Sequence, residues 1–164
     1  MRTAKRWLLV IATLMTPALA LSAGGGGGGG GAGTTATAPA NPQYARALAA
    51  IKAEQYSTAI PLLQAYLATS PNDADAENWL GYSYRKSGNL DAAFTHYDKA
   101  LALDPKHRGV HEYVGEAYLM AGNLAKAEEH LKVLDQLCWL PCEEYSDLKK
   151  AITEYKAKPG VAAR

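Results

Sequence analysis

The stretch Trp79-Leu80-Gly81-Tyr82-Ser83-Tyr84, followed by Gly88-Asn89-Leu90, has a counterpart 34 residues later in the chain. Residues 74–107 align with residues 108–141 without a gap. The identical pairs in this alignment are Gly81/Gly115, Tyr84/Tyr118, Gly88/Gly122, Asn89/Asn123, Leu90/Leu124, Ala93/Ala127, His96/His130 and Leu103/Leu137. A period of this length is typical of stacked helix-turn-helix units, in which each unit buries its apolar face against its neighbours.

The repeated small residues indicate where helices touch and where they end. Gly81 and Gly115 fall in the middle of predicted helices, where glycine costs up to ~1 kcal/mol relative to alanine. We therefore expect the second helix of the same unit to approach closely at both, with Ala93 and Ala127 as its small contact residues. Gly88-Asn89 and its counterpart tolerate left-handed backbone angles and should end the first helix of each unit.

These residues carry a resemblance to the tetratricopeptide repeat family. Residues 74–107 are similar to the pattern of that family almost throughout, and residues 108–141 resemble it with Leu134 and Trp139 as departures. Residues 41–73 look like a degenerate first repeat that keeps Ala47, Ala59, Leu63 and Pro71. The resemblance implies an all-α fold, a right-handed superhelical stack of three helix-turn-helix repeats plus a C-terminal capping helix.

Start and stop signals agree with these boundaries. Asn41-Pro42 can start a helix, Pro71-Asn72-Asp73 can stop one helix and cap the next, and Asp104-Pro105 should do the same again. The predicted repeat helices are 42–54, 57–69, 74–87, 91–103, 108–121 and 124–137.

The last repeat needs a cap, because a terminal repeat otherwise exposes an apolar face. Residues 142–157 can supply it, since Tyr145, Leu148, Ile152 and Tyr155 fall on one helical face. Residues 158–164 are expected to be a disordered tail.

The first forty residues do not resemble folded protein. Residues 1–20 have the basic, apolar and small-residue order of a secretory signal peptide, with cleavage expected after Ala20. The apolar run is shorter than the roughly 20 residues of a spanning helix, so we expect no membrane insertion after cleavage. Residues 21–40 include Gly24 to Gly31 and predict a disordered linker. The protein is therefore expected in the periplasm or outside the cell.

The charge balance argues against nucleic acid as a partner. The chain has 17 basic and 16 acidic residues. Removing residues 1–20 takes away three basic residues and no acidic residue, which leaves 14 and 16 and a formal net charge of −2. A protein that neutralises phosphates needs a basic excess on some face, and the sequence has no such cluster.

Few residues suggest chemistry. Cys138 and Cys142 are the two cysteines, and in an exported protein they most simply form a disulfide, with a redox or metal role as the alternative. His107 and His111 have a spacing that could share a helical face, but they lack the acidic residue of the metalloprotease pattern. No nucleophile has a convincing base partner. We therefore expect a non-catalytic protein without a metal or other cofactor.

The resemblance implies a partner-binding groove, because in this family the first helix of each repeat lines the concave face. Its expected residues are Tyr44, Leu48, Ile51, Lys52, Asp75, Asn78, Tyr82, Arg85, Lys86, Glu112, Glu116, Leu119 and Met120. The apolar members of this set would form an exposed strip, which usually marks a partner site. The carboxylate clamp of the family is not expected here, because Tyr44 and Leu48 stand where its first lysine and asparagine should be.

The sequence therefore favours an exported scaffold that binds an unidentified protein or peptide in its groove. Two alternatives remain open at this point. One is a self-assembling structural subunit, which would form a homo-oligomer. The other is a redox or metal-handling protein that uses Cys138 and Cys142.

Overall fold

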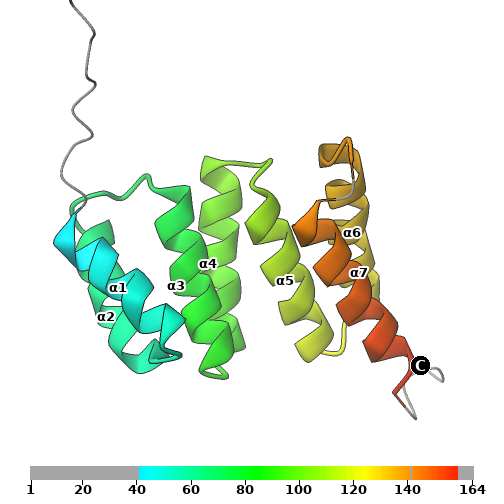
Figure 1. Ribbon diagram of the computed structural model, residues 1–164, viewed down its shortest axis with the longest axis horizontal. Coiled ribbons are helices and arrows are strands. Elements are labelled where there is room, and N and C mark those ends of the chain that lie inside the picture. The colour runs from blue at the N-terminus through cyan, green and yellow to red at the C-terminus, as the bar shows by residue number, and fades with distance from the viewer. Residues whose placement is uncertain (1–40, 141, 159–164) are drawn as a thin grey trace, which may run out of the picture. The chain divides into compact units, whose positions relative to one another are not determined.

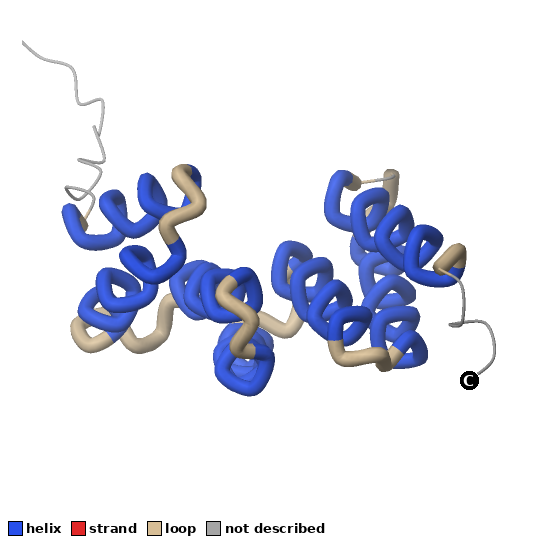
Figure 2. The backbone as a smooth tube through the Cα atoms, turned by 90° about the horizontal axis from the view of Figure 1, so that it is seen from below, coloured by secondary structure: helices blue, strands red, loops and turns tan. Residues whose placement is uncertain are grey.

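Seven α-helices make up most of the part of the chain that the structure, a computed structural model, describes, residues 41–140 and 142–158 (Figure 1). They are α1 (Pro42–Lys52), α2 (Tyr56–Leu67), α3 (Ala74–Lys86), α4 (Leu90–Leu103), α5 (Arg108–Met120), α6 (Leu124–Leu137) and α7 (Glu143–Lys156). The described residues contain no strand (Figure 2), so the predicted all-α class is confirmed. The predicted signal peptide, residues 1–20, and the predicted linker, residues 21–40, lie outside the described residues.

The helices form three successive pairs and one additional helix. Within each pair, α1 packs on α2, α3 on α4, and α5 on α6. The first helices of the pairs also contact one another in sequence, α1 with α3 and α3 with α5, and α7 continues this row by packing on α5 (Figure 1). None of the helices in the described part of the chain is long and apolar enough to cross a membrane.

Short polar side chains start most of the helices. Asn41, Asp73, Asn89 and Asn123 each accept a hydrogen bond from a backbone N–H in the first turn of the helix that follows. The prediction that Asp104 would cap α5 is wrong. Asp104 ends α4, and the residue that caps α5 is His107, whose Nδ1 accepts from the backbone N–H of Val110 at 3.3 Å.

Glycines mark the turns and the closest helix contacts. Gly88 and Gly122 have φ of 84° and 77°, which places the turn within each of these two repeats where the sequence predicted it. A Cβ on Gly81 would lie 2.7 Å from the ring of Tyr97 and 3.2 Å from the carbonyl oxygen of Ala93, both on α4. The predicted close approach by the second helix of the repeat is thus confirmed at Gly81.

Gly115 differs from this prediction. A Cβ there would lie 2.6 Å from Leu148, which belongs to α7 and not to the helix that carries Ala127. Leu148 and Ile152 are buried, as the expected capping face requires. The seventh helix therefore packs on both α5 and α6 at the end of the stack, and it makes at Gly115 the close approach that α4 makes at Gly81.

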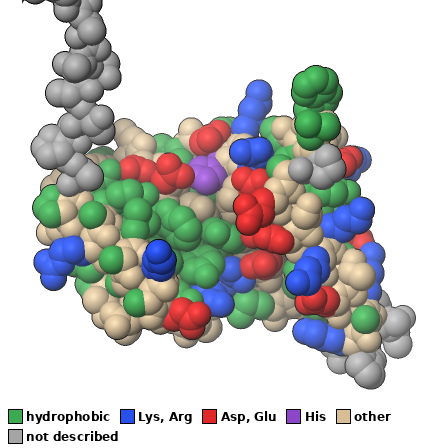
Figure 3. Space-filling model, in the orientation of Figure 1, with side chains coloured by type: hydrophobic (Ala, Val, Ile, Leu, Met, Phe, Trp, Pro, Cys, Tyr) green, Lys and Arg blue, Asp and Glu red, His purple; other side chains and the backbone are tan. Residues whose placement is uncertain are grey.

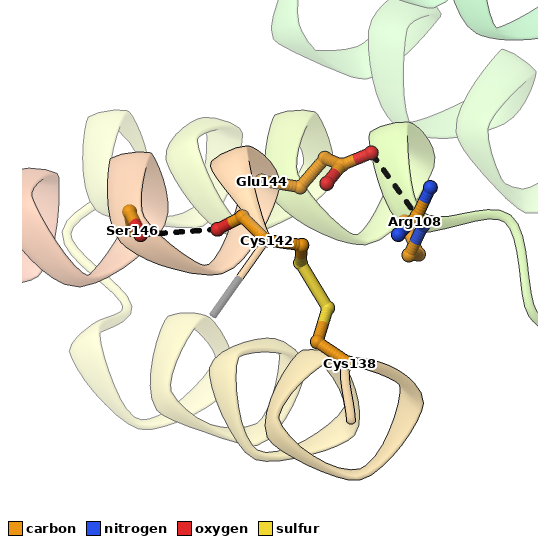
Figure 4. Close-up of a disulfide and its surroundings, with 5 residues drawn as sticks. All are labelled: Arg108, Cys138, Cys142, Glu144 and Ser146. Carbon is orange, nitrogen blue, oxygen red and sulfur yellow. Dashed lines mark hydrogen bonds and ion pairs between the residues drawn. A yellow bond between two sulfur atoms is a disulfide. The ribbon is translucent and has the colours of Figure 1, made fainter. Parts of the chain in front are cut away.

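A disulfide joins the end of α6 to the start of α7. Cys138 follows the last residue of α6 and Cys142 precedes the first residue of α7, and the two are bonded (Figure 4). The predicted pairing is therefore present in the structure. Arg108 Nε lies 3.5 Å from Glu144 Oε1, so the first turn of α7 is also tied to the start of α5. Together these contacts fix the end of α7 that carries three acidic side chains, Glu143, Glu144 and Asp147.

Candidate functional site

A groove of about 530 Å³ lies along α3, α5 and α7. Its walls combine aromatic, apolar and charged side chains, and the face that includes these helices shows a hydrophobic area beside an acidic band (Figure 3). The lining residues are Tyr82, Arg85, Lys86, Glu112, Tyr113, Glu116, Leu119, Met120, Ala151, Glu154, Tyr155 and Lys158. The structure thus brings together the residues predicted for this groove on α3 and α5 from Tyr82 to Met120.

Aromatic rings form one side of this groove. We call Tyr56, Trp79, Tyr82 and Tyr113 the aromatic cluster. The ring centroids of Tyr82 and Tyr113 lie 4.9 Å apart, and Trp79 lies 5.7 Å from Tyr82 and 6.1 Å from Tyr113. Tyr56, at the start of α2, lies 5.9 Å from Tyr82. Rings at these distances pack favourably and hold one another in fixed positions, so the cluster offers a rigid surface.

Arg85 lies under this surface and is not an exposed binding residue. It is 7% exposed, and its Nη1 lies 2.7 Å from Glu116 Oε2. Its guanidinium also lies 5.3 Å from the ring centroid of Tyr82 and 5.6 Å from that of Tyr113. Arg85 lines the groove as expected, but its guanidinium is not free for a partner, because it is buried, paired with Glu116 and packed against the rings of Tyr82 and Tyr113.

Other expected groove residues are also buried. Ile51, Asn78 and Leu119 are 9%, 3% and 8% exposed, so the predicted exposed apolar strip is wrong for Ile51 and Leu119. Met120 is 55% exposed. Tyr44 on α1 does not line the groove and instead packs on Tyr66, with ring centroids 4.8 Å apart.

The other members of α1 and α3 are accounted for as follows. Leu48 is partly buried against the core residues shared by α1, α2 and α3, and Lys52 is exposed at the end of α1. Lys86 is exposed, and its Nζ lies 5.9 Å from the ring centroid of Tyr82. The Oδ1 atom of Asp75 lies 2.9 Å from the Nε2 atom of His107.

A second hollow of about 330 Å³ adjoins the groove through Glu112 and Tyr113, which line both. Its other walls are mostly acidic and aromatic, and they come from α3, the start of α5 and the first turns of α7. They are Asp75, Asn78, Trp79, His107, Gly109, Glu143, Glu144 and Asp147. We call this second hollow the acidic hollow.

Glu112 has the most perturbed carboxylate on this face. Partial burial raises the pKa of Glu112 to about 8, and the carboxylates of Glu116, Asp147 and Glu144 act in the same direction. The Arg85 guanidinium opposes this shift. The anionic form of Glu112 is thus destabilised by its surroundings, and a cation that binds beside it would stabilise that form.

The histidines make pairs within the fold. His96 Nδ1 lies 2.6 Å from Glu77 Oε2, and the ring of His96 stacks on Tyr84. His111 and His130 occupy the equivalent positions one repeat later, with 2.9 Å between their Nδ1 atoms. His107 and His111, whose spacing could place them on one helical face, have different partners, Asp75 for His107 and His130 for His111. Among the described residues, no group of three or more histidine, cysteine or acidic side chains is arranged to hold a metal ion.

Sequence reasoning missed the aromatic residues Trp79 and Tyr113 and the contribution of α7. The signal for the first was present, since Trp79 and Tyr113 stand 34 residues apart and both are large and aromatic. The contribution of α7 has no separate signal in the sequence, because the apolar spacing of residues 142–157 indicates only a capping helix. Ala151, Glu154, Tyr155 and Lys158 belong to the groove wall, and Asp147 belongs to the acidic hollow.

The chain belongs to the tetratricopeptide repeat family. Two tetratricopeptide repeat profiles match residues 44–108 and 84–136, and together they span more than half of the 164 residues. This agrees with three helix pairs stacked so that their first helices line one face.

Among curated proteins, the chain is 39% identical over 67 residues to cellulose synthase operon protein C of Escherichia coli strain K12. It is 30% identical over 90 residues to superkiller protein 3 of Saccharomyces cerevisiae. These matches cover 41% and 55% of this chain, but only 6% of each of the two relatives. The similarity is therefore limited to a short run of repeats within much longer proteins.

Solved structures show the same fold. The type III secretion translocator chaperone SycD of Yersinia enterocolitica superposes with a TM-score of 0.63 at 23% identity, over 70% of this chain and 81% of that one. MamA of Desulfovibrio magneticus RS-1 superposes with a TM-score of 0.54 at 31% identity, over 57% of this chain and 53% of that one. These proteins establish the repeat stack as a known architecture.

Proposed function

We propose that this protein is a non-catalytic scaffold that binds a segment of another polypeptide in the groove along α3, α5 and α7. The observation that carries the proposal is that two rings of the rigid aromatic cluster, Tyr82 and Tyr113, line the same groove as Met120, which is 55% exposed. Large aromatic residues and methionine are enriched at the centres of protein interfaces. The groove is open, and its polar groups are distributed along its length, which suits an extended ligand more than a small molecule.

The fold of SycD supports a peptide as the ligand. SycD has been solved in complex with a peptide of the translocator YopD, and this chain superposes on that complex with a TM-score of 0.60 at 23% identity. A stack of this size can therefore accommodate a peptide. The partner of this chain is proposed from its own groove, because an identity of this level relates the folds and not the ligands.

The binding proposal predicts different effects for two exposed apolar residues. Met120→Asp should weaken peptide binding at least about tenfold, or about 1.4 kcal/mol, because it removes an apolar contact and would leave an unpaired charge against the bound peptide. Leu103→Asp is the matched control, since Leu103 is 40% exposed on α4 and does not line the groove. The measurement is isothermal titration with peptides selected on the wild-type chain from a library of short random peptides.

The binding proposal has two ways to fail in this experiment. One is that no peptide is enriched over a blank support. The other is that Met120→Asp and Leu103→Asp bind the selected peptides with the affinity of the wild type.

We also propose that the protein acts outside the cytoplasm. The support is the order of basic, apolar and small residues in residues 1–20, together with the cysteine pair, which suits an oxidising compartment. Mass spectrometry of the protein recovered from its native cells should show a chain that begins at Leu21. A recovered chain that still begins at Met1 would contradict export by a cleaved signal.

A further inference from the structure

The acidic hollow has more carboxyl groups than the cationic side chains beside it can pair. Of its acidic residues, Glu144 is paired with Arg108 at 3.5 Å and Asp75 with His107 at 2.9 Å. Within the described part of the chain, its other three acidic residues, Glu112, Glu143 and Asp147, are in no ion pair. The local surplus therefore lies at the point where α5 faces the first turns of α7.

A buried amide beside the hollow is also without a partner. Asn78 lines the hollow from α3 and is 3% exposed. Its Oδ1 accepts no hydrogen bond from any described residue. Leaving a buried acceptor unpaired typically costs about 1–3 kcal/mol. The unpaired Asn78 Oδ1 therefore favours a bound partner that supplies a hydrogen-bond donor at this position.

Aromatic rings complete the walls. Trp79 and Tyr113 line the same hollow, with ring centroids 6.1 Å apart. A guanidinium group stacks on such rings while its N–H groups donate to carboxylates, and arginine is the side chain that combines both abilities. A bare metal ion would not use the rings, and the carboxylates of the described residues do not converge as metal ligands.

We propose that the acidic hollow binds an arginine side chain of the partner peptide, with Glu112 and Asp147 as its anionic contacts. This inference rests on the proposed function, because it names the chemistry of one position in the same peptide. The adjoining groove holds the apolar residues of the peptide beside Met120 and the aromatic cluster. The recognised segment is thus an apolar stretch next to an arginine.

The first test is the composition of the selected peptides. Peptides selected on the full wild-type chain should be enriched in arginine next to apolar residues. The same selection on the double variant Glu112→Gln/Asp147→Asn should lose the arginine enrichment and keep the apolar one. Both substitutions replace a carboxylate by its neutral amide of the same shape, so they should leave the fold intact, which circular dichroism checks.

A matched control separates the hollow from the net charge of the protein. Asp98→Asn/Asp135→Asn replaces the same number of carboxyl groups, at exposed positions on α4 and α6. The best selected peptide is then compared with a version in which citrulline, which is neutral, replaces arginine. The citrulline peptide should bind the wild type and the control variant at least about tenfold more weakly, as for loss of a buried charged contact. On Glu112→Gln/Asp147→Asn the two peptides should differ by less than about threefold.

Binding should also depend on pH through Glu112. Its raised pKa, about 8, means that the carboxyl group is mostly protonated at pH 7, and it must lose this proton to pair with the guanidinium. Affinity for the arginine peptide should therefore rise by up to about tenfold from pH 7 to pH 9, and the rise should be absent in Glu112→Gln. The charged groups that face Glu112 are Glu116, Glu144, Asp147 and Arg85. Asp75 and His107 share the hollow with it.

The outcomes distinguish the two proposals. If no peptide is selected, the proposed function fails. If peptides are selected without arginine, or if the arginine preference persists in Glu112→Gln/Asp147→Asn, the inference fails and the proposed function stands. Binding of Ca²⁺ to the wild type that competes with the arginine peptide and disappears in the double variant would also overturn it, in favour of a metal site.

Discussion

Replacing Arg85 by alanine is expected to lower the free energy of unfolding by about 3–5 kcal/mol, the usual cost of breaking a buried ion pair by removing one partner. Arg85 is 7% exposed, and its partner Glu116 would be left without the guanidinium that lies 2.7 Å away. The rings of Tyr82 and Tyr113 would also lose the side chain that packs against them. Chemical denaturation followed by circular dichroism measures the change.

An exposed ion pair provides the control. Lys126 lies 2.7 Å from Glu129 on the surface of α6, and Lys126→Ala should leave stability unchanged within error. Equal stability of Arg85→Ala and the wild type would show that the guanidinium is not buried as described. A practical consequence is that loss of binding in Arg85→Ala would reflect altered structure, so exposed residues such as Met120 are the better probes of binding.

Replacing Gly81 by alanine should lower the free energy of unfolding by about 1–3 kcal/mol, the usual cost of overpacking a helix contact. The added methyl group would lie 2.7 Å from the buried ring of Tyr97 and 3.2 Å from a backbone oxygen of α4. This cost must exceed the gain of up to ~1 kcal/mol that alanine brings to a helix. Thermal and chemical unfolding both report the balance.

Gly109→Ala is the matched control, because Gly109 also lies in a helix. Its added methyl group would have its nearest neighbour at 3.4 Å, which is close to an ordinary contact. Gly109→Ala should therefore be neutral or slightly stabilising. The repeat packing described for α3 and α4 would be wrong if Gly81→Ala were as stable as Gly109→Ala.

Much of the fold could be predicted from the sequence because its signals are local. Turn glycines, short polar caps and helical periodicity act within a few residues of where they stand, and Gly88 and Asp73 have the predicted roles. Asn89, which was expected to help end α3 in a left-handed conformation, has a negative φ and caps α4 instead. The prediction at Asp104 was wrong because α5 begins at Arg108, so the residue that precedes its first turn is His107, while Asp104 only ends α4.

The candidate site was less predictable, because exposure depends on neighbouring helices. The sequence placed Arg85, Asn78 and Leu119 on the correct helices, but it could not show that adjacent helices cover them. The perturbed pKa of Glu112 likewise requires α7, whose Glu144 and Asp147 come close only after the chain has folded. The repeat pattern predicted the position of Tyr82, whereas the wall formed by α7 followed from tertiary packing.

Two equivalent side-chain pairs, one in each of two successive repeats, should make these repeats respond differently to low pH. In the repeat of α3 and α4 the partner of His96 is a carboxylate, Glu77, whereas in the next repeat the partner of His130 is a second imidazole, His111. Burial and, to a smaller extent, the neighbouring imidazole of His111 lower the pKa of His130 to about 4. Between about pH 6.5 and pH 4, His130 therefore binds a proton in the unfolded chain but not in the folded chain.

The resulting stability contribution is present above about pH 6.5 and is lost as the pH falls through about 4. The loss is expected in the repeat of α5 and α6, which contains His130. A single exchange between duplicated units, glutamate at position 77 and histidine at position 111, thus gives the α5–α6 repeat an acid sensitivity of its own.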